Sequence, residues 1–334
     1  MQKFQLARIR KTSNQHFQHR TNTAPPLRKN PQEKPEILKS IHKIGKHNTN
    51  SHKNCYISSH TTKTFSIMDY LWILLAISFL VSAVGWIYFI YFFSIGYGLA
   101  ISALAVATAI IFADTITLPA AILCSTLFIY GIRLAGYLLM REKRSASYKQ
   151  ILYQPENTER KPLLAMFMIW ISCALLYIGQ MSPCTFYLHN MEQGAPTNET
   201  WAWAGAIVAA IGVIIEMVAD AQKSAAKKIN PKRFVDTGLY RLVRCPNYFG
   251  EVLMWTGSYI ICFGSSCTAG QWIIATLGYI GIVYVMFSGA RRLELRQQET
   301  YGNDPEFQAY IKHRPLIIPF LPIYSVAKHT WLKG

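Results

Sequence analysis

Gly238-Leu-Tyr-Arg-Leu-Val-Arg-Cys-Pro-Asn-Tyr-Phe-Gly-Glu251 sets polar side chains at the start of an otherwise apolar helix. Cys245 can cap that helix, and Pro246 suits its first position, where the missing N–H is no loss. The polar residues that then share one face, at three- and four-residue steps, are Arg244, Asn247, Tyr248 and Glu251. A polar stripe that opens a membrane span is costly unless it lines a cavity or binds a ligand, so the stretch predicts a site.

Composition divides the chain into two parts at Met68. Hydrophobic residues make up 51% of the chain and charged residues 15%, yet the formal net charge is +17. Residues 1–67 hold 13 Lys/Arg against two acidic residues and contain no long apolar run, which predicts a disordered basic tail. From Met68 onward, 21 Lys/Arg face 15 Asp/Glu between long apolar blocks, so residues 68–334 are predicted to form a polytopic membrane domain.

Seven apolar blocks have about the 20 residues that a helix needs to cross the hydrocarbon core of a bilayer. They predict an all-α membrane protein of about seven transmembrane helices. The predicted spans are 69–85, 88–113, 117–140, 163–183, 201–220, 247–264 and 270–290. The turn between the first two spans is hard to place, because residues 85–97 are apolar and aromatic throughout.

The basic residues after Met68 predict the orientation of these spans. All 21 lie in three stretches, 133–161, 223–244 and 291–333, and the alternate connections hold none. The positive-inside rule therefore places the three stretches and the C-terminus in the cytoplasm. An endoplasmic reticulum membrane and a bacterial inner membrane fit this pattern equally well.

The basic tail conflicts with this orientation, because the same rule leaves the start of the first span on the other side of the membrane. We therefore expect Met68 to be the true start of the protein. Two alternatives stay open: a transit peptide, since the tail lacks acidic residues before Glu33, or a segment that holds nucleic acid or anionic lipid. The tail has no interleaved aromatic residues and no folded scaffold, so no nucleic-acid partner is expected.

The polar stripe divides by depth into an anion-binding part and a neutral part. Arg241 and Arg244 precede the helix, where its positive end also favours negative groups. Asn247, Tyr248 and Glu251 lie up to a turn deeper and would hold a neutral group. The alternative is that the two arginines only mark the membrane boundary and that Tyr248 belongs to the aromatic belt, but the set as a whole favours a site.

Charged residues also enter the third and fifth predicted spans. Glu216 and Asp220 are one helical turn apart, and a carboxylate as deep as Glu216 needs a partner. Asp220 could accept a hydrogen bond from a ribose or a carboxamide, or only pair with a neighbouring lysine. Arg133 lies about two turns from the cytoplasmic end of its span, and it could snorkel outward or point inward at an acidic ligand or at these carboxylates.

The chain after the last span alternates basic and acidic residues before a proline-rich end. Arg292, Glu294 and Arg296 lie on a helix that is predicted to leave the membrane and stop at Gly302. A second helix would start after Asp304-Pro305, and the proline-rich segment beyond it would fold back on the membrane. That segment could cover a pocket or be an interfacial clasp without a ligand.

The seven cysteines do not indicate a metal site, because they form no Cys-x-x-Cys pair and have no His beside them at ligand spacing. Cys262 and Cys267 could pair if their compartment is oxidising, although small membrane-embedded residues are the commoner explanation.

Three blocks of sequence carry a family resemblance. They are Ala219-Asp-Ala-Gln-Lys223, Phe234-x-x-Thr-Gly-Leu-Tyr-Arg-x-x-Arg-x-Pro-Asn-Tyr-Phe-Gly-Glu251, and the ending from Tyr301-Gly to Ile318-Pro319. With them the chain resembles the steroid 5α-reductase C-terminal family, more narrowly its bacterial-type, largely uncharacterised branch, over residues 68–322. Tyr130-x-x-Arg133-Leu134 is similar to the Trp-x-x-Arg-Leu of many members.

The resemblance implies a seven-helix membrane reductase that holds NADPH in a cavity open to the cytoplasm and reduces a carbon–carbon double bond conjugated to a ketone. Asn247 and Glu251 would contact the nicotinamide end, and Arg292 or Arg296 the outer phosphates. The cofactor-binding residues expected in all are Arg133, Asp220, Arg241, Arg244, Asn247, Tyr248, Glu251, Arg292 and Arg296. The substrate would be a steroid-like, sterol, polyprenyl or fatty acyl enone.

Two departures from the family pattern affect the expected site. Most relatives have His where this chain has Cys245, which puts a role of that imidazole in doubt. The Gln-Glu-Leu-Pro segment that supplies the proton-donating carboxylate of steroid-reducing members is also absent here. No motif therefore assigns the group that polarises the ketone. The candidates to test first are the phenols Tyr97 and Tyr130, and the alternative is that both only pack in the core or belong to the aromatic belt.

Two other function classes stay open. Isoprenylcysteine carboxyl methyltransferases and related lipid methyltransferases share the Arg-x-Pro-x-Tyr opening and would use S-adenosylmethionine, but Cys245 and the sequence from Asn247 to Glu251 favour the reductases. A non-enzymatic lipid-binding membrane protein that kept the fold is the third possibility. The expected partners are a lipid-like small molecule and the membrane, and the oligomeric state is left open.

Overall fold

The computed structural model describes residues 65–144 and 162–332. The chain divides into two compact units, Met1–Thr64 and Phe65–Gly334, and the first unit lies outside the described residues. The expectations for the basic tail, including a true start at Met68, therefore stay predictions. So does the expectation for the basic stretch 145–161, which also lies outside the described residues.

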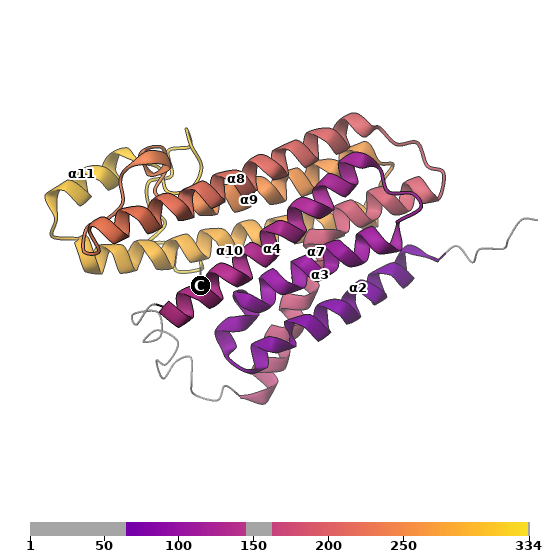
Figure 1. The fold of residues 1–334 in the computed structure, drawn as a ribbon, viewed down its shortest axis with the longest axis horizontal. Coiled ribbons are helices and arrows are strands. Elements are labelled where there is room, and N and C mark those ends of the chain that lie inside the picture. The colour runs from indigo at the N-terminus through magenta and orange to yellow at the C-terminus, as the bar shows by residue number, and fades with distance from the viewer. Residues whose placement is uncertain (1–64, 145–161, 333–334) are drawn as a thin grey trace, which may run out of the picture. The chain divides into compact units, whose positions relative to one another are not determined.

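The described residues are mostly helical and contain no β-strand, and a segment without a helix, 314–332, follows the last helix (Figure 1). The long helices are α2 (Ile67–Ser82), α3 (Ile95–Ile111), α4 (Leu118–Arg144), α7 (Leu163–Glu192), α8 (Glu199–Ile229), α9 (Pro246–Ile260) and α10 (Ala269–Tyr301). The short ones are η1 (Ala83–Trp86), η2 (Phe89–Phe93), η3 (Gly238–Arg241), η4 (Ile261–Gly264) and α11 (Pro305–His313). The predicted all-α fold is confirmed.

Six helical segments of the described chain are long and apolar enough to cross a membrane. They are Ile67–Trp86, Phe89–Ile111, Leu118–Lys143, Leu163–Glu192, Glu199–Ile229 and Ala269–Tyr301. The seventh predicted span, 247–264, is the shorter helix α9 extended by η4. This number agrees with the predicted count of about seven, and the protein is an integral membrane protein as predicted. Exposed apolar side chains such as Leu80, Ile110 and Leu277 give it a lipid-facing surface.

Local sequence explains where several helices begin and end. Ser66 caps α2 and Thr268 caps α10, each with a reciprocal capping box. Asp304 accepts hydrogen bonds from the first turn of α11, which confirms the predicted restart after a stop at Gly302. Cys245 is the N-cap residue of α9, but its side chain makes no capping hydrogen bond, so that part of the expectation was wrong.

Glycines bring α8 and α9 into backbone contact, and the two helices run side by side (Figure 1). A methyl group at Gly212 would lie 2.4 Å from the backbone nitrogen of Met254, and one at Gly250 would lie 2.7 Å from the backbone nitrogen of Glu216. Approaches this close exclude any larger residue. They fix Glu216 of α8 beside Gly250, the neighbour of Glu251 in α9.

The ends of α4, α8 and α10 lie at the same end of the bundle as the start of α9 (Figure 1). We call this the basic end, since its charged side chains include Arg244, Arg292 and Arg296. A turn at this end explains a glycine and a glutamine of the family blocks. Gly238 has φ +61°, which favours glycine, and the Gln222 side chain accepts a hydrogen bond from the Leu239 N–H at 2.8 Å. These motif residues therefore build the turn before α9.

Candidate functional site

Tyr97, Glu251 and Trp255 form a hydrogen-bonded chain inside the bundle. The Tyr97 hydroxyl, on α3, donates to Oε1 of Glu251, on α9, at 2.8 Å. One turn further along α9, Nε1 of Trp255 donates to the Tyr97 oxygen at 2.9 Å. All three side chains are buried. The chain thus places a carboxyl group and a phenol at one point of an apolar core.

Tyr130 of α4 lies beside this chain. Its ring centroid is 6.2 Å from that of Tyr97 and 6.5 Å from that of Trp255, in both cases edge to face. The side chain is fully buried, and its hydroxyl lies close to the Tyr97 hydroxyl and to Glu251 without forming a well-aligned hydrogen bond within the described residues. Tyr130 therefore offers an O–H donor that can turn to a substrate, whereas the Tyr97 hydroxyl is already engaged.

Arg133 of α4 points inward, which settles the alternative between snorkelling and pairing. Its Nη1 donates to Oδ2 of Asp220 at 3.0 Å, and its Nη2 pairs with Oε1 of Glu216. The side chains of Arg133, Asp220 and Glu216 are 18%, 15% and 5% exposed, respectively. Arg133 Nε and Glu216 Oε2 are buried without a partner in the described chain, so this cluster keeps one free donor and one free acceptor.

The first turn of α9 presents two half-buried polar side chains, Asn247 and Tyr248. Neither makes a side-chain hydrogen bond within the described residues. A methyl group at Gly289 of α10 would be 3.4 Å from the Tyr248 hydroxyl, so this turn faces α10. Tyr248 therefore lies against α10, and both polar groups are left without a hydrogen bond in the described part of the chain.

Arg244 binds groups of the protein itself. It is 3% exposed, and its Nη1 donates to Oε1 of Glu294 at 3.1 Å and to the carbonyl oxygen of Tyr324 at 2.8 Å. Oε2 of Glu294 accepts from the Val326 N–H at 2.9 Å. The pair therefore fastens the C-terminal segment to the start of α9, and a contact of Arg244 with a phosphate stays a prediction.

Arg292 and Arg296 are exposed one turn apart on α10 and form no ion pair within the described residues. They lie in a hollow of about 240 Å³ at the basic end. The residues that line it are Arg291, Arg292, Leu295, Arg296 and Glu299. Three guanidinium groups against one carboxylate make this hollow suited to a polyanion.

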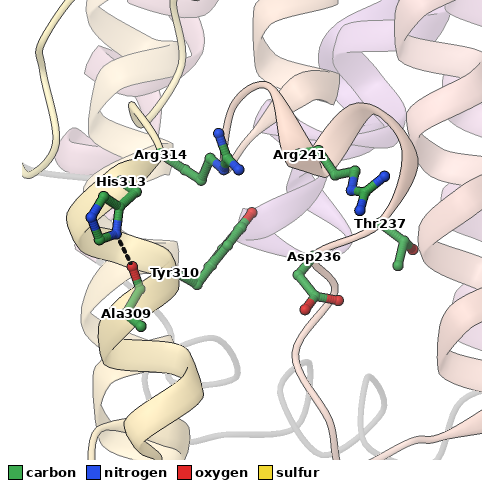
Figure 2. Close-up of a pocket in the computed structure, with 7 residues that line it drawn as sticks. All are labelled: Asp236, Thr237, Arg241, Ala309, Tyr310, His313 and Arg314. Carbon is green, nitrogen blue, oxygen red and sulfur yellow. Dashed lines mark hydrogen bonds between the residues drawn. The ribbon is translucent and has the colours of Figure 1, made fainter.

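Arg241 belongs to a different hollow, of about 340 Å³, between η3 and α11 (Figure 2). The residues that line it are Asp236, Thr237, Arg241, Ala309, Tyr310, His313 and Arg314. Figure 2 shows Arg241 on the same side as Asp236 and Thr237, facing Tyr310 and Arg314 across the opening. Arg241 is thus not brought into contact with Glu251 or Asn247.

Cys245 is buried under the C-terminal segment, where its N–H donates to the carbonyl oxygen of Leu316 at 2.8 Å. Burial raises the pKa of its thiol to about 11, so the group is neutral at physiological pH. Cys262 and Cys267 are free thiols in this structure, and their pairing in an oxidising compartment stays a prediction.

The sequence missed Trp255, which has no charge and resembles a core residue. Its position four residues after Glu251 puts it on the same helical face, and that spacing is the signal that could have found it. For Glu216 the sequence predicted only a need for a partner, and the structure makes it a member of the site.

Residues 76–314 match the family described as Protein of unknown function (DUF1295). Two proteins named Steroid 5-alpha-reductase DET2, from Gossypium hirsutum and Arabidopsis thaliana, are each 27% identical to the chain, over 136 and 142 residues. These matches cover 37% and 40% of this chain and 45% and 47% of the two relatives, so the chain spans about half the length of the curated relatives that it matches. No solved structure matches the chain.

Proposed function

The chain belongs to the DUF1295 family and is similar to steroid 5-alpha-reductases, and from this premise we propose that it reduces a lipid enone with NADPH. Hydride would add to the carbon of the double bond that lies farther from the ketone, a proton taken up from solvent would add to the nearer one, and NADP⁺ would leave. The lipid would enter from the membrane, and the basic end would face the cytoplasm.

One observation carries this proposal: a hydrogen-bonded chain and a charged cluster meet at the crossing of α8 and α9. Tyr97, Glu251 and Trp255 join α3 to α9 there. Arg133 and its two carboxylates join α4 to α8, with Glu216 packed against Gly250. A reductase of this kind needs such a junction, because a polar cofactor must reach an apolar substrate there.

The unpaired groups of the site fit NADPH. Arg292 and Arg296 would bind its outer phosphates, and the free amide of Asn247 would bind the carboxamide of its nicotinamide. Arg133 Nε and Glu216 Oε2, both buried without a partner in the described chain, supply one more donor and one more acceptor. We propose further contacts from Asp220, Arg241, Arg244, Tyr248 and Glu251.

When bound, NADPH would supply the hydride. The Tyr130 hydroxyl would donate a hydrogen bond to the ketone oxygen of the substrate and stabilise the negative charge that develops there. Tyr97 would hold Glu251 in position through the bond that it already makes. The apolar side chains around these groups would keep water away and so strengthen each interaction.

Thermal unfolding of the purified protein in detergent tests the cofactor. NADPH at 100 times its Kd should stabilise the protein by about 2.7 kcal/mol, and S-adenosylmethionine should not. Arg296→Ala should require more NADPH for the same shift. Stabilisation by S-adenosylmethionine alone would instead support a methyltransferase, and stabilisation by neither would support a non-enzymatic lipid-binding protein.

A further inference from the structure

Gln180 of α7 is a buried amide for which the proposed reaction has no role. Its side chain is 2% exposed, and neither its Oε1 nor its Nε2 has a hydrogen-bond partner within the described residues. It lies near the middle of α7, a helix long and apolar enough to cross the membrane. An unpaired amide at such a depth is costly, because no bulk water is there to satisfy it.

The face of α7 that carries Gln180 is turned toward the candidate site. Tyr177 and Cys184 lie three residues before and four residues after Gln180, so they share its face. The Tyr177 ring lies 5.3 Å from the ring of Tyr97 on α3, and Cys184 Sγ lies 3.8 Å from Cys124 Sγ on α4. Gln180 is therefore placed next to the helices that carry the two tyrosines of the site.

A third helix, α9, also contacts Gln180. The backbone carbonyl of Gln180 accepts a hydrogen bond from the hydroxyl of Ser258 on α9 at 3.4 Å. Ser258 lies one turn beyond Trp255, the residue that donates to Tyr97. The amide thus belongs to the part of the core where α3, α4, α7 and α9 surround the proposed reaction centre.

We propose that Gln180 binds a hydroxyl group of the lipid substrate. A hydroxyl both accepts and donates, so one such group pairs the N–H and the oxygen of the amide together. Tyr130 is left for the ketone. The inference rests on the proposed function and narrows its substrate class to enones that carry a hydroxyl group.

A purely structural role predicts the opposite response to substitution. Gln271 is the matched control, because it is also buried on a long helix but its amide is paired with that of Asn190, at 3.1 and 3.0 Å. Replacing a paired amide by Met leaves a partner unsatisfied and destabilises the protein. Replacing an unpaired amide by an apolar group of similar size stabilises the ligand-free protein.

The experiment compares Gln180→Met with Gln271→Met in three measurements. The first is the Tm without ligand. The second is the Tm shift caused by each lipid of a panel in which the same enone is present with a hydroxyl group at several positions and without one. The third is kcat/KM for each lipid with NADPH. Gln180→Leu is the second variant if the Met variant does not fold.

For wild type we expect one hydroxylated enone to be preferred over its parent by about tenfold in kcat/KM, the effect of one pair of buried hydrogen bonds. Gln180→Met should raise the Tm of the ligand-free protein by a few degrees and abolish that preference. Gln271→Met should lower the Tm and keep the preference.

The inference is wrong if Gln180→Met lowers the Tm as Gln271→Met does and leaves the preference unchanged. If wild type reduces no enone, the proposed function fails and the lipid-induced Tm shift decides the inference alone. The inference is then supported if a hydroxylated lipid raises the Tm of wild type more than its parent lipid does, and if Gln180→Met loses this difference. Equal stabilisation of wild type and variant, or an absence of extra stabilisation in wild type, overturns it.

Discussion

The hydroxyl of Tyr97 donates to the carboxyl group of Glu251 across 2.8 Å and so joins α3 to α9. The two residues are 154 positions apart in the sequence. The bond places a carboxyl group from the polar stripe of α9 in the apolar core, where Tyr130 and Trp255 surround it. The chemistry that we propose depends on this junction.

Removing the junction should affect stability and activity differently in two variants. Tyr97→Phe leaves Glu251 without its donor and the Trp255 N–H without its acceptor, so we expect a loss of about 1–3 kcal/mol of stability. Glu251→Gln keeps an acceptor oxygen for Tyr97 and should lose less stability, but should still reduce NADPH-dependent activity at least tenfold. Unfolding curves and NADPH consumption check both. Equal destabilisation by the two variants would contradict a hydrogen bond that Tyr97 donates and Glu251 accepts.

Arg133 pairs with two carboxylates, so its replacement should strongly destabilise the protein. Arg133→Met leaves Glu216 and Asp220 without their cation inside the bundle, so we expect a loss of about 3–5 kcal/mol. Arg296→Met removes the same charge from an exposed position that has no ion pair within the described residues, and should leave the Tm unchanged while weakening NADPH binding about tenfold. Thermal unfolding with and without NADPH measures both effects. Similar Tm values for the two variants would argue against the buried cluster.

Arg244 should matter for the position of the C-terminal segment. Arg244→Met removes the donor to the Tyr324 carbonyl and leaves the buried Glu294 unpaired. We expect trypsin to cut after Lys328 much faster in this variant than in wild type, as followed by mass spectrometry. Arg292→Met is the control and should be cut at the wild-type rate. Wild-type cutting of Arg244→Met, together with loss of NADPH binding, would instead assign Arg244 to the cofactor.

The contact between α8 and α9 predicts opposite signs for two glycine substitutions. Gly212→Ala would place a methyl group 2.4 Å from the backbone of Met254, and we expect a loss of about 1–3 kcal/mol from the forced separation. Gly136→Ala on α4 meets no atom within 4 Å and should gain roughly 0.5–1 kcal/mol from helix propensity. Unfolding in detergent measures both. A gain for Gly212→Ala would contradict the close crossing.

Two thiols outside the spans should react at different rates. Burial raises the pKa of Cys245 to about 11, whereas hydrogen bonding with Cys262 lowers the pKa of the partly exposed Cys267. At pH 8, iodoacetamide should therefore modify Cys267 well before Cys245, as peptide mass spectrometry would resolve. Because the folded protein keeps the Cys245 proton, its contribution to stability should be full below about pH 8.5 and be lost as the pH rises toward 11. Cys245→Ala should remove that alkaline loss.

The sequence predicted what depends on local pattern. Apolar runs gave the spans, and the turn expected within residues 85–97 lies between η1 and η2. The stop at Gly302 and the restart at Asp304 followed from helix-capping rules and are confirmed. The motifs predicted a steroid 5α-reductase-like family, which the comparisons confirm.

The sequence could not predict which helices are neighbours. Whether Arg133 turned outward or inward depended on α8 lying beside α4, which no local pattern encodes. Arg244 was expected to bind a ligand because it opens the polar stripe. Its partner Glu294 is 50 residues away in the sequence, so no local pattern predicted this ion pair. Trp255 and Gln180 carry no charge, so in the sequence each resembles an ordinary core residue. The roles of all these residues at a cofactor or a substrate stay predictions.

Isotope transfer tests the central claim most directly. The purified protein in lipid nanodiscs would be mixed with NADPH carrying deuterium on the transferable hydrogen and with a panel of lipid enones, and the products analysed by mass spectrometry. The account predicts a saturated ketone that carries one deuterium, at the carbon farther from the ketone in the former double bond, and its loss in Glu251→Gln. A protein that folds and binds lipid but transfers no deuterium to any enone of the panel would contradict it.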